Sequence, residues 1–546
     1  MVRRSIRLAD PAAAGSAALV GRFAHVRADL NIPEDFPPEV LEAARAAARS
    51  PEEPDTDLTD IPFVTVDPPG SVDLDQAMYL TRRGQGYHVD YAIADVPAFL
   101  DPEGPVAVEA MRRGQTLYAP DVRVPLHPPV LSEDAASLLP GRTRPAFVWR
   151  LDLDPDGEVV AVAMVRALVR SRHRLDYATI QAAANARPSR GPGHGSHVQR
   201  PRTVLDPTDD LTRQAVLLRE IGRRRLVLEQ RRGGASLPLP EQEVSFDRGA
   251  FRLRFRPALP AQDWNAQLSL MTGMVAAEIM LEAGTGVLRT LPQPPDHVLA
   301  RFARQAEALG VPWPEGATYG EFIRGLDRDR PAHLALLYDA ATLFRGAGYT
   351  AFDGEPPEQP EHAAVAAPYA HVTAPLRRLV DRFGLIICYS VTAGFEIPDW
   401  VREALPDLGR QMALSDRLAN SLERRCVDLV ESALLAERAG EDFEAVTVEV
   451  GRDRTVIQIL QPAVLALCEG VLPLGEQVRV RLEAVDPDAA KVRFVPDGAG
   501  PPPGEPAQEP AAAAGTLGTG RAGRAAASGG EPPAEESPDS TGLSGG

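Results

Sequence analysis

Lysine is almost absent from this sequence. Lys491 is its only lysine, and arginine supplies every other strongly basic side chain. The chain is also rich in Ala, Gly and Pro, so an arginine at any one position says little about function by itself. The net charge of −18 argues against general affinity for nucleic acid, although it is compatible with a local basic channel.

Cysteine and long apolar runs are scarce as well. Cys388, Cys426 and Cys468 form no C-x-x-C pair, which argues against zinc and disulfide frameworks and favours buried structural thiols. No apolar run approaches membrane-spanning length. The basic N-terminus has only a short apolar part, broken by Asp, Pro and Gly, so we read no signal peptide there. We therefore expect a cytoplasmic protein with no membrane partner.

The pattern of residues changes along the chain and predicts four parts. Residues 1–60 are short and interrupted by proline, with one helix expected from Pro37. Residues 61–440 begin with strand patterns and continue mainly as long helices. Residues 441–496 alternate with period two in four or five short strands, which predicts a small OB-type barrel. Residues 497–546 are rich in Pro, Ala and Gly, and we expect this tail to be disordered.

Three aspartates interrupt the apolar stretch FVTVDPPGSVDLDQAMYL, which runs from Phe63 to Leu80. Asp73 and Asp75 face the same side in extended backbone, and Asp67 ends a short strand before a Pro-Pro-Gly turn. If the three carboxylates converge, they repel one another unless a cation neutralises them. Oxygen-only ligands suit Mg²⁺, with Mn²⁺ as the alternative. Taken alone, however, the spacing favours ordinary turn and surface aspartates over a metal site.

Further segments carry residue types that could act with this cluster. Tyr118 stands in EAMRRGQTLYAP, Arg377 and Arg378 stand in HVTAPLRRLVDRF near a helix start, and Glu423 stands in SLERRCVD inside a long helix. Each segment alone is typical of a core aromatic, a solvated arginine pair or an ordinary helix. Only their combination is specific.

Together, in this order and at these separations, the segments resemble the motifs of the ribonuclease II (RNB) family of exoribonucleases. The matching stretches are TVDPPGSVDLDQA, AIADV, RGQTLYAP, YAHVTAPLRRLVD and, in part, LERRCVD. The resemblance spans roughly Ile61 to Ala439. It implies an α+β fold, in which an RNB catalytic domain of mixed sheet surrounded by helices precedes the small OB-type barrel. It also implies Mg²⁺-dependent 3′→5′ hydrolysis of single-stranded RNA to nucleoside 5′-monophosphates, with no DNA substrate expected.

The resemblance also implies roles for individual residues. By matching position, Asp67, Asp73 and Asp75 would be the metal carboxylates, and Asp75 would act in catalysis. Arg377 would also be catalytic, because a cation opposite the carboxylates can stabilise the charge that builds on the attacked phosphate.

The same matching assigns the RNA contacts. Tyr118 would stack on the 3′-terminal base. Arg378 would hold a backbone phosphate. Glu423 would line the channel near the terminal nucleotide and its 2′-OH. The sequence gives no protein partner.

Two departures from the family pattern keep alternatives open. Gln76 stands where the family usually has a fourth aspartate; its amide oxygen can coordinate a metal but brings no charge, which makes it an uncertain metal-site neighbour. Residues 1–60 are too short for the two cold-shock domains that family members commonly carry, so we expect a short form. The main alternative is a catalytically impaired RNA-binding protein on the same fold. Another is a Mg²⁺ phosphodiesterase that acts on DNA or a small phosphoester.

Overall fold

The structure is a computed structural model, and it describes residues 4–6, 17–186, 210–237, 239, 241–247, 250–256 and 258–497. Backbone contacts divide the chain into two compact units, residues 1–498 and residues 499–546. The predicted disordered tail lies outside the described residues, apart from its first position.

The largest sheet is mixed, with the strand order β2-β9-β3-β4-β5-β8. Its strands are β2 (Thr56–Asp57), β3 (Phe63–Val66), β4 (Gln76–Arg83), β5 (Gly86–Ala94), β8 (Thr143–Leu153) and β9 (Val159–Leu175). In β9, residues 159–170 pair antiparallel with β8, whereas residues 171–175 pair in parallel with β3. Because β3 and β9 run in the same direction, both end at the same edge of the sheet.

The remaining elements fall into three groups. The α-helices are α1 (Ala17–Asp29), α2 (Pro38–Arg49), α3 (Pro105–Arg113), α4 (Tyr177–Asn185), α5 (Asp210–Arg232), α6 (Pro260–Ala283), α7 (Asp296–Ala308), α8 (Tyr319–Arg324), α9 (Pro331–Ala340), α10 (Leu379–Ala393) and α11 (Asp399–Leu435). The short helical turns are η1 (Val96–Phe99), η2 (Leu131–Ala135), η3 (Ala341–Phe344) and η4 (Ala436–Arg438). The smaller sheets use β1 (Arg4–Ile6), β6 (Leu117–Tyr118), β7 (Arg123–Val124), β10 (Glu241–Asp247), β11 (Ala250–Arg256), β12 (Thr285–Thr290), β13 (Gly348–Asp353), β14 (Glu361–His362) and β15 (Ala367–Pro368).

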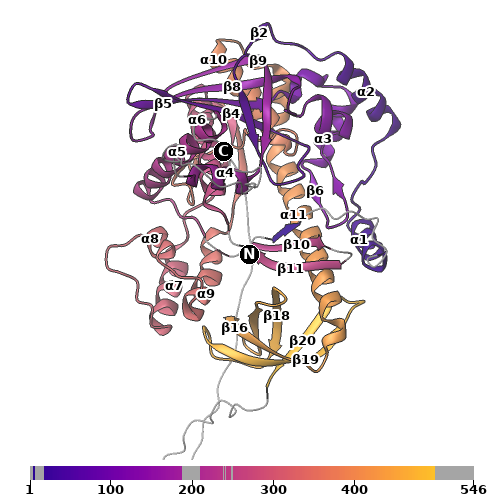
Figure 1. Ribbon diagram of the computed structural model, residues 1–546, viewed down its shortest axis with the longest axis vertical. Helices are drawn as coiled ribbons and strands as arrows, with labels where there is room; N and C mark the ends of the chain where they lie inside the picture. The colour runs from indigo at the N-terminus through magenta and orange to yellow at the C-terminus, as the bar shows by residue number, and fades with distance from the viewer. Residues whose placement is uncertain are drawn as a thin grey trace, which may run out of the picture. The chain divides into compact units, whose positions relative to one another are not determined.

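The two faces of the large sheet are covered by different helices (Figure 1). Side chains such as Tyr91 and Trp149 pack on one face against α5, α6 and α10. Small side chains such as Ala92 and Val148 pack on the opposite face against α2, η1 and η2. This alternation along β5 and β8 is what a strand buried on both sides requires, and it explains the nearly continuous apolar pattern there.

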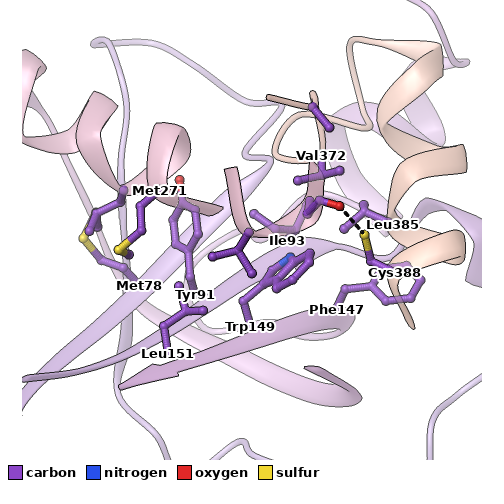
Figure 2. Close-up of a cluster of buried hydrophobic side chains, with 14 of the residues drawn as sticks. Met78, Tyr91, Ile93, Phe147, Trp149, Leu151, Met271, Val372, Leu385 and Cys388 are labelled. Atoms are coloured by element: carbon purple, nitrogen blue, oxygen red, sulfur yellow. Dashed lines mark hydrogen bonds between the residues drawn. The ribbon is translucent and has the colours of Figure 1, made fainter. Parts of the chain in front are cut away.

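Figure 2 shows the larger cluster, in which the sheet residues meet α6, α10 and the loop before α10. Trp149 is fully buried, and Val372 of that loop reaches the same cluster. The thiol of Cys388 donates to the carbonyl of Ala276, with 3.7 Å between sulfur and oxygen. All three cysteines are free and buried, as the sequence predicted. Through Val372, the loop before α10 is thus anchored in the core.

The N-terminal region contains more structure than the sequence analysis expected. The helix after Pro37 is present as α2, but α1 was not predicted. Phe23 and Val26 of α1 are buried in the same cluster as residues of α11, and Arg425 of α11 donates to Asp29 at 2.7 Å. Because α1 is held by a helix residue 396 positions away in sequence, its local pattern alone did not reveal it.

The helical half of the chain also contains strand pairs that were not predicted. Between α6 and α10, β12 and β13 form an antiparallel pair whose strands are separated by three helices. Sequence periodicity does not reveal such a distant pairing. Across the described residues, no helix is both long and apolar enough to cross a membrane.

The C-terminal strands close into a barrel with the order β16-β17-β18-β20-β19. They are β16 (Asp442–Val450), β17 (Arg454–Ile459), β18 (Val464–Glu469), β19 (Gln477–Asp486) and β20 (Lys491–Pro496). Alternate residues, among them Ile457, Leu482 and Phe494, fill the interior. The prediction of an α+β fold ending in a small OB-type barrel is therefore confirmed.

Candidate active site

The predicted carboxylates lie at the edge of the large sheet where β3 ends and β4 begins. Asp67 follows β3, and its backbone N–H donates to the carbonyl of Leu175 at 3.0 Å, which continues the β3–β9 pairing. Its side-chain atom Oδ2 is buried and has no hydrogen-bond partner. Burial raises the pKa of Asp67 to about 7, although Arg377 opposes the shift, and the nearby Asp73 raises it further. A buried carboxylate oxygen without a partner is costly, so this atom is a natural position for a cation.

Asp75 connects this edge of the sheet to the arginine motif, the segment HVTAPLRRLVDRF that contains Arg377 and Arg378. Its side chain is 3% exposed, and its Oδ1 accepts a hydrogen bond of 2.8 Å from the backbone N–H of Leu376. The other oxygen lies 3.2 Å from Nε of Arg377. Burial raises the pKa of Asp75 to about 8, against the opposing effect of Arg377. The two residues predicted to act in catalysis are thus in direct contact.

The charge of Asp73 raises the pKa of both Asp67 and Asp75. Asp73 also has an ion-pair partner of its own. Its Oδ1 is 2.6 Å from a guanidinium nitrogen of Arg123, and the other terminal nitrogen of Arg123 is 2.5 Å from Glu133. The sequence analysis did not single out Arg123. Nothing in the local sequence around Arg123 reveals that it meets an aspartate 50 positions earlier.

Gln76, the first residue of β4, uses both ends of its amide. Nε2 donates to the carbonyl of Thr373 at 2.7 Å, and Oε1 accepts from the hydroxyl of Tyr91 at 2.6 Å. Ser269 of α6 lies 3.5 Å from the same oxygen. The amide is therefore hydrogen-bonded to protein groups at both of its ends.

The arginine motif and the tyrosine motif are held together through their backbones. The N–H of Thr116 donates to the carbonyl of Arg377 at 2.9 Å, and the N–H of Leu379 donates to Gly114 at 2.9 Å. Tyr118 follows on β6, and its side chain is 36% exposed. An accessible aromatic ring beside the carboxylates suits base stacking.

The two arginines of the motif differ in their surroundings. Arg377 is 48% exposed and faces Asp75. Arg378 donates twice to Asp381, at 2.9 and 2.8 Å, and Asp381 also accepts from the N–H of Ala374 at 2.6 Å. This bidentate pair fixes the turn that presents Arg377. Whether Arg378 also holds an RNA phosphate stays a prediction.

Glu423 lies half-buried on α11, the helix that contacts β6 and thereby the strand of Tyr118. Its predicted contact with a terminal nucleotide is not tested by the protein alone.

Tyr177 is a further residue at the site that the sequence analysis missed. It is the first residue of α4, whose N-cap Asp176 accepts from the N–H of Thr179 at 2.7 Å. Burial raises the pKa of Tyr177, and the charge of Asp67 raises it further. The parallel pairing of β3 and β9 brings these two residues together, and this pairing was not visible in the sequence.

The donor chemistry of the site fits a magnesium ion, although the carboxylates do not form a closed cage. Within the described ranges, no three acidic, histidine or cysteine side chains are arranged as a ready-made metal group. Arg123 holds Asp73, and Asp75 is shared with Leu376 and Arg377. Magnesium is commonly held by one or two carboxylates together with substrate phosphates, and the buried free oxygen of Asp67 is such a donor.

Comparison with known proteins gives two family matches. Residues 55–387 match the RNB domain, and residues 441–497 match the RNase II-type exonuclease C-terminal S1 domain. Ribonuclease R of Escherichia coli is 25% identical over 510 residues, which cover 84% of this chain and 58% of that protein. Exosome complex exonuclease RRP44 homolog A of Arabidopsis thaliana is 29% identical over 342 residues, which cover 60% of this chain and 34% of that protein. The chain thus spans between a third and three-fifths of the length of these two relatives.

Solved structures share the fold. Mycoplasma genitalium RNase R in complex with ribose methylated single-stranded RNA superposes with a TM-score of 0.76 at 17% identity, covering 88% of this chain and 78% of that one. Yeast Ssd1, described as a pseudonuclease, superposes with a TM-score of 0.62 at 16% identity, covering 78% of this chain and 52% of that one. The fold therefore occurs both in a nuclease and in a pseudonuclease. Only the residues of the site can distinguish these two functions.

Proposed function

Because this chain belongs to the RNB family, we propose that it is a 3′→5′ exoribonuclease that hydrolyses single-stranded RNA to nucleoside 5′-monophosphates with Mg²⁺, or with Mn²⁺ in its place. The observation that carries the proposal is the contact between Asp75 and Arg377. A carboxylate and a guanidinium 3.2 Å apart, at an edge that also bears Asp67 and the accessible ring of Tyr118, supply what attack on a terminal phosphodiester needs.

In the proposed reaction the oxygen of a water molecule bonds to the phosphorus next to the 3′-terminal nucleoside. The bond from phosphorus to the 3′ oxygen of the preceding nucleotide breaks, and the water proton ends on that 3′ oxygen. A bound divalent ion would neutralise the carboxylates and polarise the phosphate. The terminal nucleotide leaves as its 5′-monophosphate.

The chain's own residues have separate tasks in this reaction. Tyr118 stacks on the terminal base and so fixes the position of the scissile phosphate. Arg377 donates to the phosphate oxygens as their charge increases. Asp75, held by the N–H of Leu376 and by Arg377, would help to bind the ion and to orient the attacking water.

A catalytically impaired RNA-binding protein is the second candidate. The ion pair of Arg123 with Asp73 favours it, as do the lack of a ready-made metal group among the described residues and the amide at Gln76. In that case Tyr118 and the arginines would still bind a strand, but no bond would break.

A time course with 5′-labelled single-stranded RNA distinguishes the candidates. Parallel reactions contain Mg²⁺, Mn²⁺ or EDTA, and a DNA strand of the same sequence serves as the substrate control. The proposal predicts RNA that shortens from its 3′ end only with metal, and DNA that stays intact. RNA that is bound but uncut with both metals would support the impaired protein, and cleavage of DNA would support a general phosphodiesterase.

A further inference from the structure

The side chain of Gln76 connects the carboxylate edge of the sheet to the loop that carries Arg377. Its position at the start of β4 places it directly after Asp75, and its backbone pairs with Ile93 of β5. From there the side chain reaches the carbonyl of Thr373, five residues beyond the end of β15.

The orientation of the amide is set by its partners. A carbonyl oxygen can only accept, so the group that faces Thr373 at 2.7 Å must be the NH₂ end of Gln76. The oxygen end faces the hydroxyl of Tyr91 at 2.6 Å, and that hydroxyl also lies 2.9 Å from Ser269. Tyr91 is fully buried in the core beneath the site, as Figure 2 shows for its ring, so the network is fixed to the sheet.

An ionised carboxylate could not reproduce the contact with Thr373. A glutamate at position 76, which has the length of glutamine, would set an anionic acceptor against this carbonyl, and that contact would be repulsive. The amide therefore matches both of its partners, the carbonyl of Thr373 and the hydroxyl of Tyr91.

The loop has a second attachment to the same strand segment. Leu376 donates its N–H to Asp75 at 2.8 Å, three residues after Thr373. Gln76 and Asp75 thus hold the loop at two neighbouring points, immediately before Arg377. Together with the bonds from Thr116 to the carbonyl of Arg377 and from Ala374 to Asp381, these two attachments restrict the orientation of the loop.

We propose that Gln76 is a positioning residue for the arginine loop, and that it is not a ligand of the metal. The inference rests on the proposed function, because positioning matters only if Arg377 acts on a substrate. It also explains why an uncharged residue is compatible with a working site. The role of Gln76 is to donate to Thr373, and a carboxylate cannot do so.

Gln76→Met tests the inference in the full chain, because methionine has a similar length and neither amide group. Gln458→Met is the matched control: Gln458 also accepts from a tyrosine hydroxyl, that of Tyr338 at 2.5 Å, but it is a buried residue of the barrel. Three quantities are measured for each protein. They are Mn²⁺ affinity by electron paramagnetic resonance, amide hydrogen exchange of residues 370–379, and kcat and KM on a single-stranded RNA.

The expected result for Gln76→Met is unchanged Mn²⁺ affinity, faster exchange in residues 370–379, and kcat lowered about tenfold or more with KM nearly unchanged. Gln458→Met should change none of these. Weakening of Mn²⁺ binding by about tenfold would overturn the inference in favour of a metal ligand. Unchanged exchange and kcat would overturn it in favour of a residue with no positioning role.

Gln76→Glu is the second variant, in case methionine prevents folding. Glutamate keeps an oxygen for Tyr91 but loses the donor to Thr373. Positioning predicts a lower kcat, whereas metal ligation predicts tighter Mn²⁺ binding with kcat retained or increased. An inactive wild-type protein would refute the proposed function, while hydrogen exchange in the variants would still report on the loop.

Discussion

The stability of the metal-free protein should depend on pH through Asp67. Burial raises the pKa of this carboxyl to about 7 in the folded protein, from its ordinary value of 3.8. Between these two values the unfolded chain is ionised while the folded protein still holds the proton. The folded state therefore binds more protons, and its stability falls as pH rises through this window.

The size of the effect follows from the width of the window. One pKa unit corresponds to about 1.4 kcal/mol. Between pH 5 and pH 8, the folded carboxyl keeps a proton that the unfolded one has lost over roughly two pH units. Asp67 should therefore lower the free energy of unfolding by about 3 kcal/mol across this range. Above pH 8 no further loss from this group is expected, because the residue is then ionised in both states.

The assay is urea denaturation of wild type and Asp67→Asn in EDTA at pH 5 and at pH 8. Asparagine does not titrate, so the wild type should lose about 3 kcal/mol more stability than the variant between the two pH values. Adding Mg²⁺ at pH 8 should restore stability to the wild type, because the ion binds the ionised carboxylate, and should restore less to the variant. If the stability of the two proteins depended equally on pH, the assignment of a buried carboxyl with a raised pKa at Asp67 would be refuted.

Other changes to the site have equally specific outcomes. Asp75→Asn should abolish hydrolysis and leave RNA affinity within a few fold, measured by filter binding; retained activity would show that this carboxylate is not catalytic. Arg123→Gln should tighten Mn²⁺ binding severalfold, because a competing cation is removed from the carboxylates; unchanged affinity would place Arg123 outside the metal's electrostatic reach. Gly273→Ala should lower both the thermal midpoint and kcat, because the new methyl carbon would lie 2.2 Å from the ring of Tyr369, in the loop before α10. Its control, Gly21→Ala in α1, meets nothing within 4 Å and should be neutral or stabilising.

The sequence predicted those parts of the fold that depend on local patterns. The strand β3, the helix α2 and the barrel strands all have a pattern that their own residues display. The helix α1 and the β12–β13 pair were missed, because each is stabilised by contacts with residues far away in the chain. Local pattern is weak evidence for elements of that kind.

The residues of the candidate site likewise fall into a group that the sequence predicted and a group that it did not. Asp67, Asp75, Tyr118 and Arg377 were found because they lie in motifs whose combination is specific. Arg123 and Tyr177 belong to no such motif. Their place at the site follows from an ion pair with Asp73 and from the parallel pairing of β3 with β9, neither of which leaves a mark in the local sequence.

Gln76 shows what the structure adds to a motif. As a departure from the family pattern, it had no explanation in the sequence. Its contacts with Thr373 and Tyr91 supply one, because only an amide can donate at one end and accept at the other. The residue that departs from the family motif thus has a partner at each end of its amide.

The most direct test of the account is the chemical identity of the first product formed from single-stranded RNA in water enriched with oxygen-18. The account predicts a nucleoside 5′-monophosphate, released from the 3′ end, with one heavy oxygen in its phosphate, and no such product from Asp75→Asn. A 3′-phosphate or cyclic phosphate product, or intact RNA under both metals, would contradict it.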